Sequence, residues 1–265
     1  MRQLKRYVGL YWLFLLNRFK ILMEYRANFF IGASSTVFVQ AASIGAIWVV
    51  MRQIPSLNGW TLDEIFLVYG LLTLAKSINH MFADNLWTLG HAYIRPGGFD
   101  RFLVRPIDPL FHLLADRFCH DGIGNFVIGL VLVVKAFGAL SIPWSLANIF
   151  YLIVAVLSGG GIFIALNLIT CVSSFWIMNS VPVTAAVFQT NEFAKYPLNI
   201  YRKSVSVVMT WAIPYGLASF YPASHLLGRD IGYMAWMMVP VSAVLLVIGY
   251  RVWGFGLRHY GGTGS

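Results

Sequence analysis

Charged residues are scarce in this sequence. Asp, Glu, Lys and Arg make up only 11% of its 265 residues, whereas hydrophobic residues make up 58%. A soluble domain carries about 25% charged residues, so the composition excludes an ordinary soluble globular protein. A helix needs about 20 apolar residues to cross a bilayer. The sequence therefore predicts an all-α integral membrane protein whose surroundings are the lipid bilayer.

Cysteine and the common catalytic motifs are also missing or nearly so. The two cysteines, Cys119 and Cys171, lie in apolar stretches and form no C-x-x-C pair, so the sequence indicates neither a disulfide framework nor a metal site. It contains no G-x-x-x-x-G-K-[ST] phosphate loop, no H-E-x-x-H and no G-x-S-x-G. We expect no cofactor or metal bound by this chain, and no enzymatic activity of its own.

The net charge of +9 is high, and such a balance can indicate a nucleic-acid-binding protein. Here the basic residues lie between apolar runs instead of forming one basic module. That distribution is typical of the positive-inside bias of membrane proteins. We therefore expect no nucleic acid partner.

The gaps between charges mark the expected membrane spans. We expect helices over residues 28–51, 62–83, 119–138, 147–171 and 231–250. Thr61, followed three residues later by Glu64, resembles a capping box that opens the second helix. The glycines at 159–161 in the fourth helix favour close packing over a hinge. Residues 84–117 form the one substantial hydrophilic segment.

Residues 172–228 admit two interpretations. They contain two apolar pieces, at 176–196 and 204–222, and if both crossed the membrane there would be seven spans, with the termini on opposite sides. Both termini are basic, which favours an even number. One piece would then be re-entrant or interfacial, and Pro214 and Gly216 favour the second piece for that role. Counting charges alone favours 204–222 as the fifth span instead.

Residues 1–26 differ from the rest of the chain. Their apolar side chains recur at helical spacing while the basic residues lie elsewhere, which predicts an amphipathic helix in the membrane interface. A disordered basic tail is the alternative. The apolar positions are Leu4, Val8, Tyr11, Trp12, Leu15, Phe19 and Leu22.

Four stretches lie in order along nearly the whole chain. They are EYRANF at 24–29, PSLNGWTL at 55–62, IRPGGFDRFLVRPIDPL at 94–110, and AKYPL at 194–198, which is continued by Ile213-Pro214 and Tyr221-Pro222-Ala223. Together they resemble the permease subunits of ABC-2-type ATP-binding-cassette exporters, in a branch formerly classified as a family of unknown function. The third stretch is the most specific.

The resemblance implies one permease domain over residues 1–265 with six transmembrane helices. The interfacial helix at 1–26 would precede the first span, residues 84–117 would form a cytoplasmic coupling loop, and residues 197–228 would form an outer re-entrant region between helices five and six. It further implies a bacterial inner-membrane location with both termini cytoplasmic, and a second permease subunit, identical or related. Separate ATP-binding-cassette ATPase subunits would bind ATP and Mg²⁺.

Within the expected coupling loop at residues 84–117, the resemblance favours ATPase contacts by Arg95, Gly97, Gly98, Asp100, Arg101, Arg105 and Pro106. From the residues themselves, we expect Asp100 to cap a short helix that ends at Pro106. One face of that helix would carry Arg101 and Arg105, and arginine makes planar bidentate contacts with acidic groups. The alternative is that both arginines face lipid headgroups and only fix the topology.

Lys76, Asn79 and His80 share one face of the second expected helix. Ionisable groups within a span usually face the bundle or a wet cavity, so these residues are candidates for a translocation pathway. Lys76 is also close enough to the helix end to snorkel to the interface, so packing is the alternative. Glu192 and Lys195, three residues apart, are expected to pair, as a structural pair or as an outer gate.

Two other functions are compatible with the composition. A membrane-embedded enzyme would need acids, histidines or a metal set to converge within the bilayer, yet the ten carboxylates lie mostly near span ends or in loops. An ATPase-independent channel or scramblase would need no ATPase partner. The transported substrate does not follow from the residues, and export as the direction is implied only by the resemblance.

Overall fold

The computed structural model describes residues 7, 9–14, 16, 20, 26–177 and 179–261. Within this part of the chain the regular secondary structure is helical, and it contains no strand. Among these described residues, five helices are long and apolar enough to cross a membrane. Their bounds are Arg26–Gln53 for α2, Leu62–Phe82 for α3, Asp121–Ala139 for α7, Leu146–Cys171 for α8 and Met238–Arg258 for α13. The predicted all-helical membrane class is confirmed.

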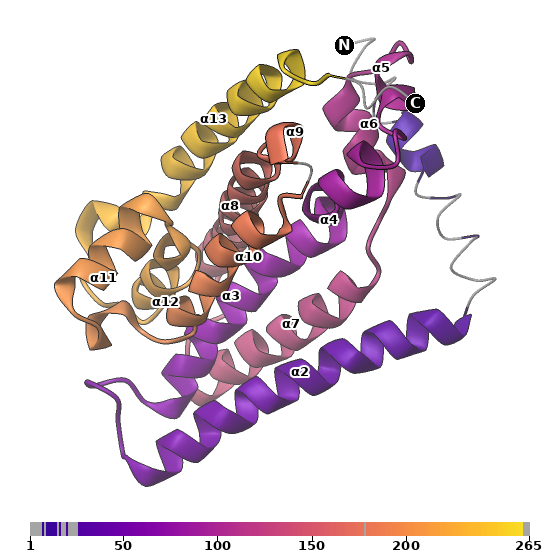
Figure 1. The fold of residues 1–265 in the computed structure, drawn as a ribbon. Helices are drawn as coiled ribbons and strands as arrows, with labels where there is room; N and C mark the ends of the chain where they lie inside the picture. Colours follow the sequence, from indigo (N-terminus) through magenta and orange to yellow (C-terminus); the bar gives the residue numbers. More distant parts are fainter. Residues whose placement is uncertain are drawn as a thin grey trace.

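Helix α3 is the centre of the bundle. Helices α7 and α8 pack along it, α13 packs on α8, and α2 lies along α7 (Figure 1). The helix begins as the sequence predicts, because the Thr61 hydroxyl accepts a hydrogen bond from the Glu64 backbone N–H, and the Glu64 carboxylate accepts one from the Thr61 N–H at 2.8 Å. This capping box satisfies two backbone donors that the first turn would otherwise leave unpaired.

The three glycines in α8 let its neighbours approach closely. A Cβ atom on Gly159 would lie 2.7 Å from the Cβ of Ala75 on α3, and one on Gly161 would lie 2.3 Å from Ser242 Oγ on α13. Both separations are shorter than real van der Waals contacts, so only a residue without a side chain fits. Small residues serve this purpose in membrane bundles, and the packing role expected for the glycine run is confirmed.

One end of the bundle, here called the α6 end, is built from short helices around aromatic side chains (Figure 1). These helices are α4 (Asp84–Trp87), η1 (Leu89–Ile94), α5 (Asp100–Leu103) and α6 (Pro109–Asp116). Phe99 and Phe102 are fully buried there. The Phe99 ring lies 6.2 Å from the ring of Trp253 on α13. These buried aromatic side chains therefore pack the hydrophilic segment against the ends of the long helices.

The described part of the N-terminal segment is helical over residues 9–14 and packs on α6. The Tyr7 ring lies 4.7 Å from that of Phe111, and the Phe14 ring lies 5.7 Å from that of His112. Most of the interfacial helix predicted over residues 1–26 falls outside the described residues.

The apolar piece at 176–196 does not form one continuous helix. Its pieces are α9 (Ser174–Ile177), α10 (Val181–Gln189) and the 3₁₀ helix η2 (Thr190–Lys195). Between α9 and α10, the Ser174 hydroxyl donates to the Ser180 hydroxyl at 2.6 Å, and the Asn179 side chain accepts from the Val181 N–H. Pro182 in the first turn of α10 lacks the N–H that a continuous helix would need.

The apolar piece at 204–222 is also divided into short helices. The short helices of this region are η3 (Leu198–Ile200), α11 (Lys203–Val207), η4 (Val208–Ala212), η5 (Tyr215–Ala218) and α12 (Phe220–Leu226). Tyr215 stacks on Phe163 of α8 with ring centroids 4.4 Å apart, and the Ser219 hydroxyl donates to the Ala194 carbonyl at 3.0 Å. These contacts hold the short helices against the bundle, and the end where they gather is here called the α12 end.

The last long helix begins and ends later than the predicted range of 231–250. The 3₁₀ helix η6 (Gly232–Ala235) comes first, and Gly232 has a φ of +55°, which an α-helix does not accommodate. Arg251 is exposed on the side of α13, so its charge does not end the helix. Helix α8 ends at the α6 end, whereas α13 starts at the α12 end (Figure 1). Residues 172–237 therefore pass from one end of the bundle to the other.

Candidate functional site

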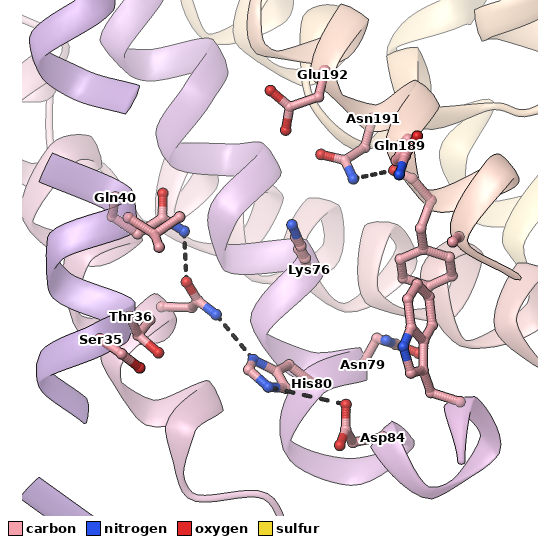
Figure 2. A pocket seen from close by; sticks show the side chains of 15 residues that line it. Ser35, Thr36, Gln40, Lys76, Asn79, His80, Asp84, Gln189, Asn191 and Glu192 are labelled. Atoms are coloured by element: carbon pink, nitrogen blue, oxygen red, sulfur yellow. Dashed lines mark hydrogen bonds and ion pairs between the residues drawn. The ribbon is translucent and has the colours of Figure 1, made fainter. Parts of the chain in front are cut away.

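A cavity of about 570 Å³ lies between α2, α3, α7, α10 and η2 (Figure 2). Its apolar wall includes Trp87 and Phe188, and polar side chains from several elements line the remainder. The main polar lining residues are Ser35, Thr36, Gln40, Lys76, Asn79, His80, Asp84, Asn125, Gln189, Asn191 and Glu192. The three candidate pathway residues of α3 therefore face one cavity together.

Lys76 provides the positive charge of the cavity. Its side chain reaches into the cavity on the side of Glu192, away from Asp84 and the end of α3 (Figure 2). Among the described residues, no carboxylate forms an ion pair with the Lys76 amino group. An ammonium group held within a bundle is costly unless water or an anion compensates it. The side chain ends in the cavity.

Asn79 joins α3 to α8 as well as lining the cavity. Its Oδ1 atom accepts a hydrogen bond from Asn167 Nδ2 at 3.1 Å, and the same Asn167 amide donates to the Ala83 carbonyl at 3.0 Å. Asn79 and Asn167 are both buried. Because buried polar groups need such partners in a bilayer, this pair fixes the angle between the two helices at the cavity wall.

His80 ends a hydrogen-bonded chain of side chains that crosses three helices. The Tyr69 hydroxyl bonds to Gln40 on α2, Gln40 Nε2 donates to Asn125 Oδ1 on α7 at 2.5 Å, and the Asn125 amide bonds to His80 Nδ1 at 3.0 Å. His80 Nε2 lies 4.0 Å from Asp84 Oδ1. Chains of this kind polarise from one bond to the next, so the cavity wall at His80 is connected by hydrogen bonds to α2.

Sequence reasoning missed Gln40 and Asn125. Both are neutral amides within apolar helices, and the sequence analysis selected candidates within spans mainly by their charge. The available signal was that each is an amide in an apolar run, where a side chain that can hydrogen-bond is expected to find a partner on a neighbouring helix.

Glu192 and Lys195 pair as expected, with Nζ and Oε2 2.5 Å apart. Lys195 also donates to the Ser43 hydroxyl on α2 at 3.2 Å and lies over the Tyr69 ring on α3, 5.5 Å from its centroid. A small hollow of about 50 Å³ beside the main cavity is lined by Lys195, Glu192 and Lys76. The pair therefore ties η2 to α2 and α3 at the upper wall of the cavity.

The candidate residues of the hydrophilic segment lie at the α6 end, apart from the cavity. Gly97 has a φ of +73° and makes the turn that follows η1, and Gly98 comes next. Arg95 and Pro106 are exposed. Asp100 is the first residue of α5 and does not cap it, because its carboxylate accepts a hydrogen bond from the Tyr260 hydroxyl at 2.8 Å. Phe99 is the N-cap residue and no side chain caps this helix, so the predicted capping role of Asp100 is wrong.

Arg101 and Arg105 do not share the face of one helix as predicted. Helix α5 ends at Leu103, so Arg105 lies beyond it. Arg101 Nη2 pairs with Asp116 Oδ2 at 3.1 Å, and Arg105 Nη1 lies 3.1 Å from His112 Nε2. Both arginines keep an exposed surface. Each is thus positioned by α6 while part of its side chain faces outward.

The exposed tip between α5 and α6 combines apolar and basic side chains. Val104 is 82% exposed and Leu103 is 42% exposed, and Arg105 and Pro106 follow them. Phe102, in contrast, is fully buried. The tip is consequently a rigid protrusion anchored by an aromatic side chain.

The sequence matches the family described as ABC-2 family transporter protein over residues 37–264. Comparisons with curated proteins and with solved structures give no match. The family match covers most of the chain, including all five long helices in whole or in large part, the cavity and the α5–α6 tip. The chain therefore belongs to the ABC-2 transporter family.

Proposed function

We propose that this chain is the permease subunit of an ABC-2-type ATP-driven exporter. It forms the substrate pathway, and a separate ATPase subunit binds ATP and Mg²⁺ and drives the movement. Family membership supports a role in membrane transport. The observation that carries the proposal is the polar cavity inside the helix bundle, with Lys76 directed into it.

The cavity fits an amphipathic substrate. Its volume of about 570 Å³ falls within the ordinary range for small-molecule sites, about 300–1,000 Å³. Trp87 and Phe188 offer apolar surface, and the amides and hydroxyls opposite them offer hydrogen bonds. Lys76 would attract an anionic or strongly polar group of the substrate, since it has no ion-pair partner among the described residues.

The proposed topology has six crossings, with both termini in the cytoplasm of a bacterial cell and the bundle in its inner membrane. The broken segment α9–α10–η2 serves as the fifth crossing, which is supported by the passage of residues 172–237 from the α6 end to the α12 end. The α12 end then faces outward. Residues 197–228 would form the re-entrant region at this end, which is supported by the stacking of Tyr215 on Phe163 of α8.

We place the ATPase contact at the α5–α6 tip. Arg101 and Arg105 flank exposed apolar residues there, and guanidinium groups suit acidic or polar groups of a partner protein. Gly97 and Gly98 allow the turn that presents the tip. Phe102 is buried under the tip, and Asp116 pairs with Arg101 on it. Through these contacts, movement of the tip by the ATPase can be transmitted to the ends of the long helices.

We place the second permease subunit, identical or related, against α2. Small residues at positions 41, 42 and 46 of that helix are exposed, and a Cβ atom on Gly45 would meet nothing within 4 Å. Small residues permit close approach of helices in lipid. This face also borders the cavity through Ser35 and Val39, so a partner there would help to enclose the substrate.

Co-purification tests the proposal. The chain, extracted in mild detergent from its own cell, should carry an ATP-binding-cassette ATPase with it. The double variant Arg101→Glu with Arg105→Glu should lose most of that ATPase yet insert normally, whereas Arg258→Glu, another exposed arginine at the α6 end, should keep it. Unchanged association in the double variant would remove the coupling assignment. Recovery of no ATPase with the wild-type chain, together with flux that needs no ATP, would indicate a channel or scramblase.

A further inference from the structure

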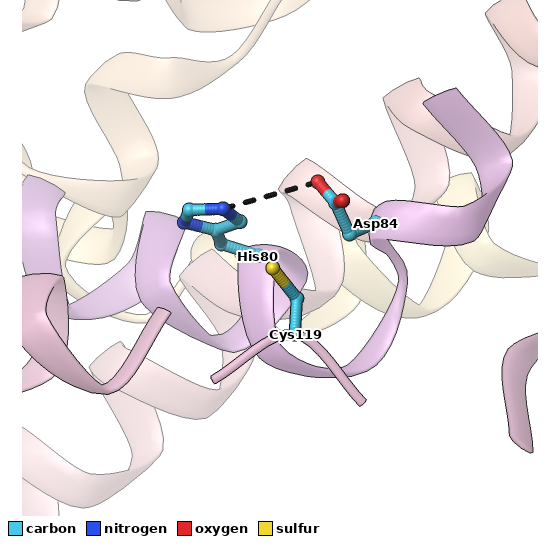
Figure 3. A group of neighbouring side chains, drawn as sticks. All are labelled: His80, Asp84 and Cys119. Atoms are coloured by element: carbon cyan, nitrogen blue, oxygen red, sulfur yellow. Dashed lines mark ion pairs between the residues drawn. The ribbon is translucent and has the colours of Figure 1, made fainter. Parts of the chain in front are cut away.

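Three side chains with different donor atoms converge where α3 ends and α7 begins. They are His80, Asp84 and Cys119 (Figure 3). One ligand atom from each lies within 4.8 Å of the others, and His80 Nε2 is 4.0 Å from Asp84 Oδ1. His80 and Asp84 also line the main cavity, and the Cys119 side chain points toward both of them (Figure 3).

The backbone holds this cluster in place. His80 lies in the last turn of α3 and Asp84 is the first residue of α4, so the break between the two helices sets their separation. The Cys119 N–H donates to the Met81 carbonyl at 3.1 Å. Gly122 brings the first turn of α7 against the same residue, since a Cβ there would lie 2.8 Å from the Met81 nitrogen. The three ligands therefore sit on one rigid junction.

The donor set has the chemistry of a zinc-type site. A tetrahedral Zn²⁺ takes imidazole, carboxylate and thiolate ligands at about 2.0–2.3 Å, which places the ligand atoms roughly 3.3–3.7 Å apart. The observed 4.0 Å between His80 Nε2 and Asp84 Oδ1 is slightly longer, so binding would draw the Asp84 carboxylate a few tenths of an ångström inward. Mixed nitrogen, oxygen and sulfur ligation favours a late first-row divalent ion over Mg²⁺ or Ca²⁺.

Neighbouring side chains border the cluster. An Asp121 carboxylate oxygen lies 4.0 Å from Cys119 Sγ, and the other oxygen of that carboxylate lies 3.2 Å from His120 Nε2. Three protein ligands leave the fourth tetrahedral position to a water molecule.

Behind the imidazole, His80 Nδ1 is 3.0 Å from the Asn125 side-chain amide. In the structure the Asn125 NH₂ group faces Nδ1, and Asn125 Oδ1 accepts from Gln40 Nε2. A metal on Nε2 needs Nδ1 to carry the proton, so the Asn125 and Gln40 amides would both reverse, and Asn125 Oδ1 would accept a hydrogen bond from Nδ1–H. Such an outer partner orients a ligating histidine.

We propose that His80, Asp84 and Cys119 bind one divalent cation of the Zn²⁺ type at the junction of α3 and α7. The ion would tie together the two helix ends that flank the hydrophilic segment 84–117, at the wall of the cavity. This site is independent of the transport proposal, since it would bind the ion whether or not the chain has an ATPase partner.

Cobalt titration of the full-length chain in detergent tests the site. After chelator treatment, added Co²⁺ should bind with one equivalent and give the near-ultraviolet thiolate-to-cobalt absorption band, which added Zn²⁺ should abolish. Cys119→Ser should lose the band. Cys171→Ser is the matched control, because Cys171 is the other buried free cysteine and lies on α8; it should keep the band. His80→Gln should weaken cobalt binding by about tenfold or more.

Three results would overturn the proposal. They are absence of a thiolate band in the wild-type chain, persistence of the band in Cys119→Ser, and its loss in Cys171→Ser. If Cys119→Ser is not monodisperse by size exclusion, cobalt binding to His80→Gln tests the site instead, because that variant keeps both native cysteines. Cobalt affinity equal to the wild-type value in that variant would also overturn the site.

Discussion

Gln40 of α2 donates a hydrogen bond to Asn125 of α7 at 2.5 Å, with both side chains buried. Most of α2 is otherwise exposed on the outside of the bundle, so this bond is a principal polar link between α2 and the other helices. The same two residues continue to Tyr69 on one side and to His80 on the other. One pair of amides thus joins the outermost helix to the cavity.

A double-mutant cycle on this pair should show coupling. Gln40→Leu and Asn125→Leu each leave a buried polar group without its partner, so each should lower stability, and the double variant should lose less than the sum. Measured couplings of this type in membrane bundles average about 0.6 kcal/mol and reach about 1.7 kcal/mol. Unfolding in detergent measures the difference, with Gln53→Leu, an exposed glutamine at the end of α2, as the control. Strictly additive losses would contradict the link.

Replacement of Lys76 should impair transport more than folding. Lys76→Gln keeps much of the side-chain length but removes the charge directed into the cavity. If the substrate carries an anionic group, its half-saturating concentration in substrate-stimulated ATPase assays should rise about tenfold, which corresponds to about 1.4 kcal/mol. Lys135→Gln on the exposed side of α7 should leave that value unchanged. Equal effects of the two substitutions would exclude a substrate contact by Lys76.

Much of the fold follows from where charges are absent. The four helices α2, α3, α7 and α8 begin and end within about three residues of their predicted bounds, because charged or turn-forming residues flank each apolar run. The segment from 174 to 237 could not be predicted in this way. Its breaks depend on Pro182 and Pro214, and on contacts with distant residues such as Phe163, which hydropathy does not encode.

The candidate site was predictable where a charge interrupts a helix. Lys76 and His80 were identified from the sequence because ionisable groups are rare in a span. The proximity of Cys119 to His80 and Asp84 was not predicted, since these residues are distant in sequence and meet only through the packing of α7 on α3. The local sequence also gave a wrong prediction at Asp100, which was expected to cap a helix. Its carboxylate accepts a hydrogen bond from the hydroxyl of Tyr260, a residue distant in sequence.

Addition of one methyl group should disturb the junction at Gly159. A Cβ there would lie 2.7 Å from the Cβ of Ala75 and 3.0 Å from the Cβ of Ala218, and neither neighbour can rotate away. Gly159→Ala should therefore force backbone shifts that cost about 1–3 kcal/mol. Thermal unfolding in detergent measures the loss. Gly138→Ala on α7 is the control, because a Cβ there meets nothing within 4 Å, and it should be neutral or slightly stabilising. Equal melting temperatures for the two variants would contradict the packing.

Acidification should loosen the α5–α6 tip through His112. Burial and the neighbouring Arg105 guanidinium lower the pKa of His112 below its ordinary value of 6.5, against the opposing charge of Asp116. Because Arg105 can only donate, His112 Nε2 accepts as neutral imidazole. The folded state thus binds fewer protons than the unfolded state in the window just below pH 6.5, so this contribution to stability is complete above pH 6.5 and is lost as the pH falls through that window.

Hydrogen exchange of residues 100–116, corrected for intrinsic rates, should therefore show less protection at about pH 5.5 than at about pH 7.5. His112→Gln removes the titrating group while keeping a hydrogen-bonding side chain, so most of this pH dependence should disappear. The exchange of α7, which lies outside the tip, serves as the internal reference. An unchanged pH dependence in His112→Gln would contradict control of the tip by His112.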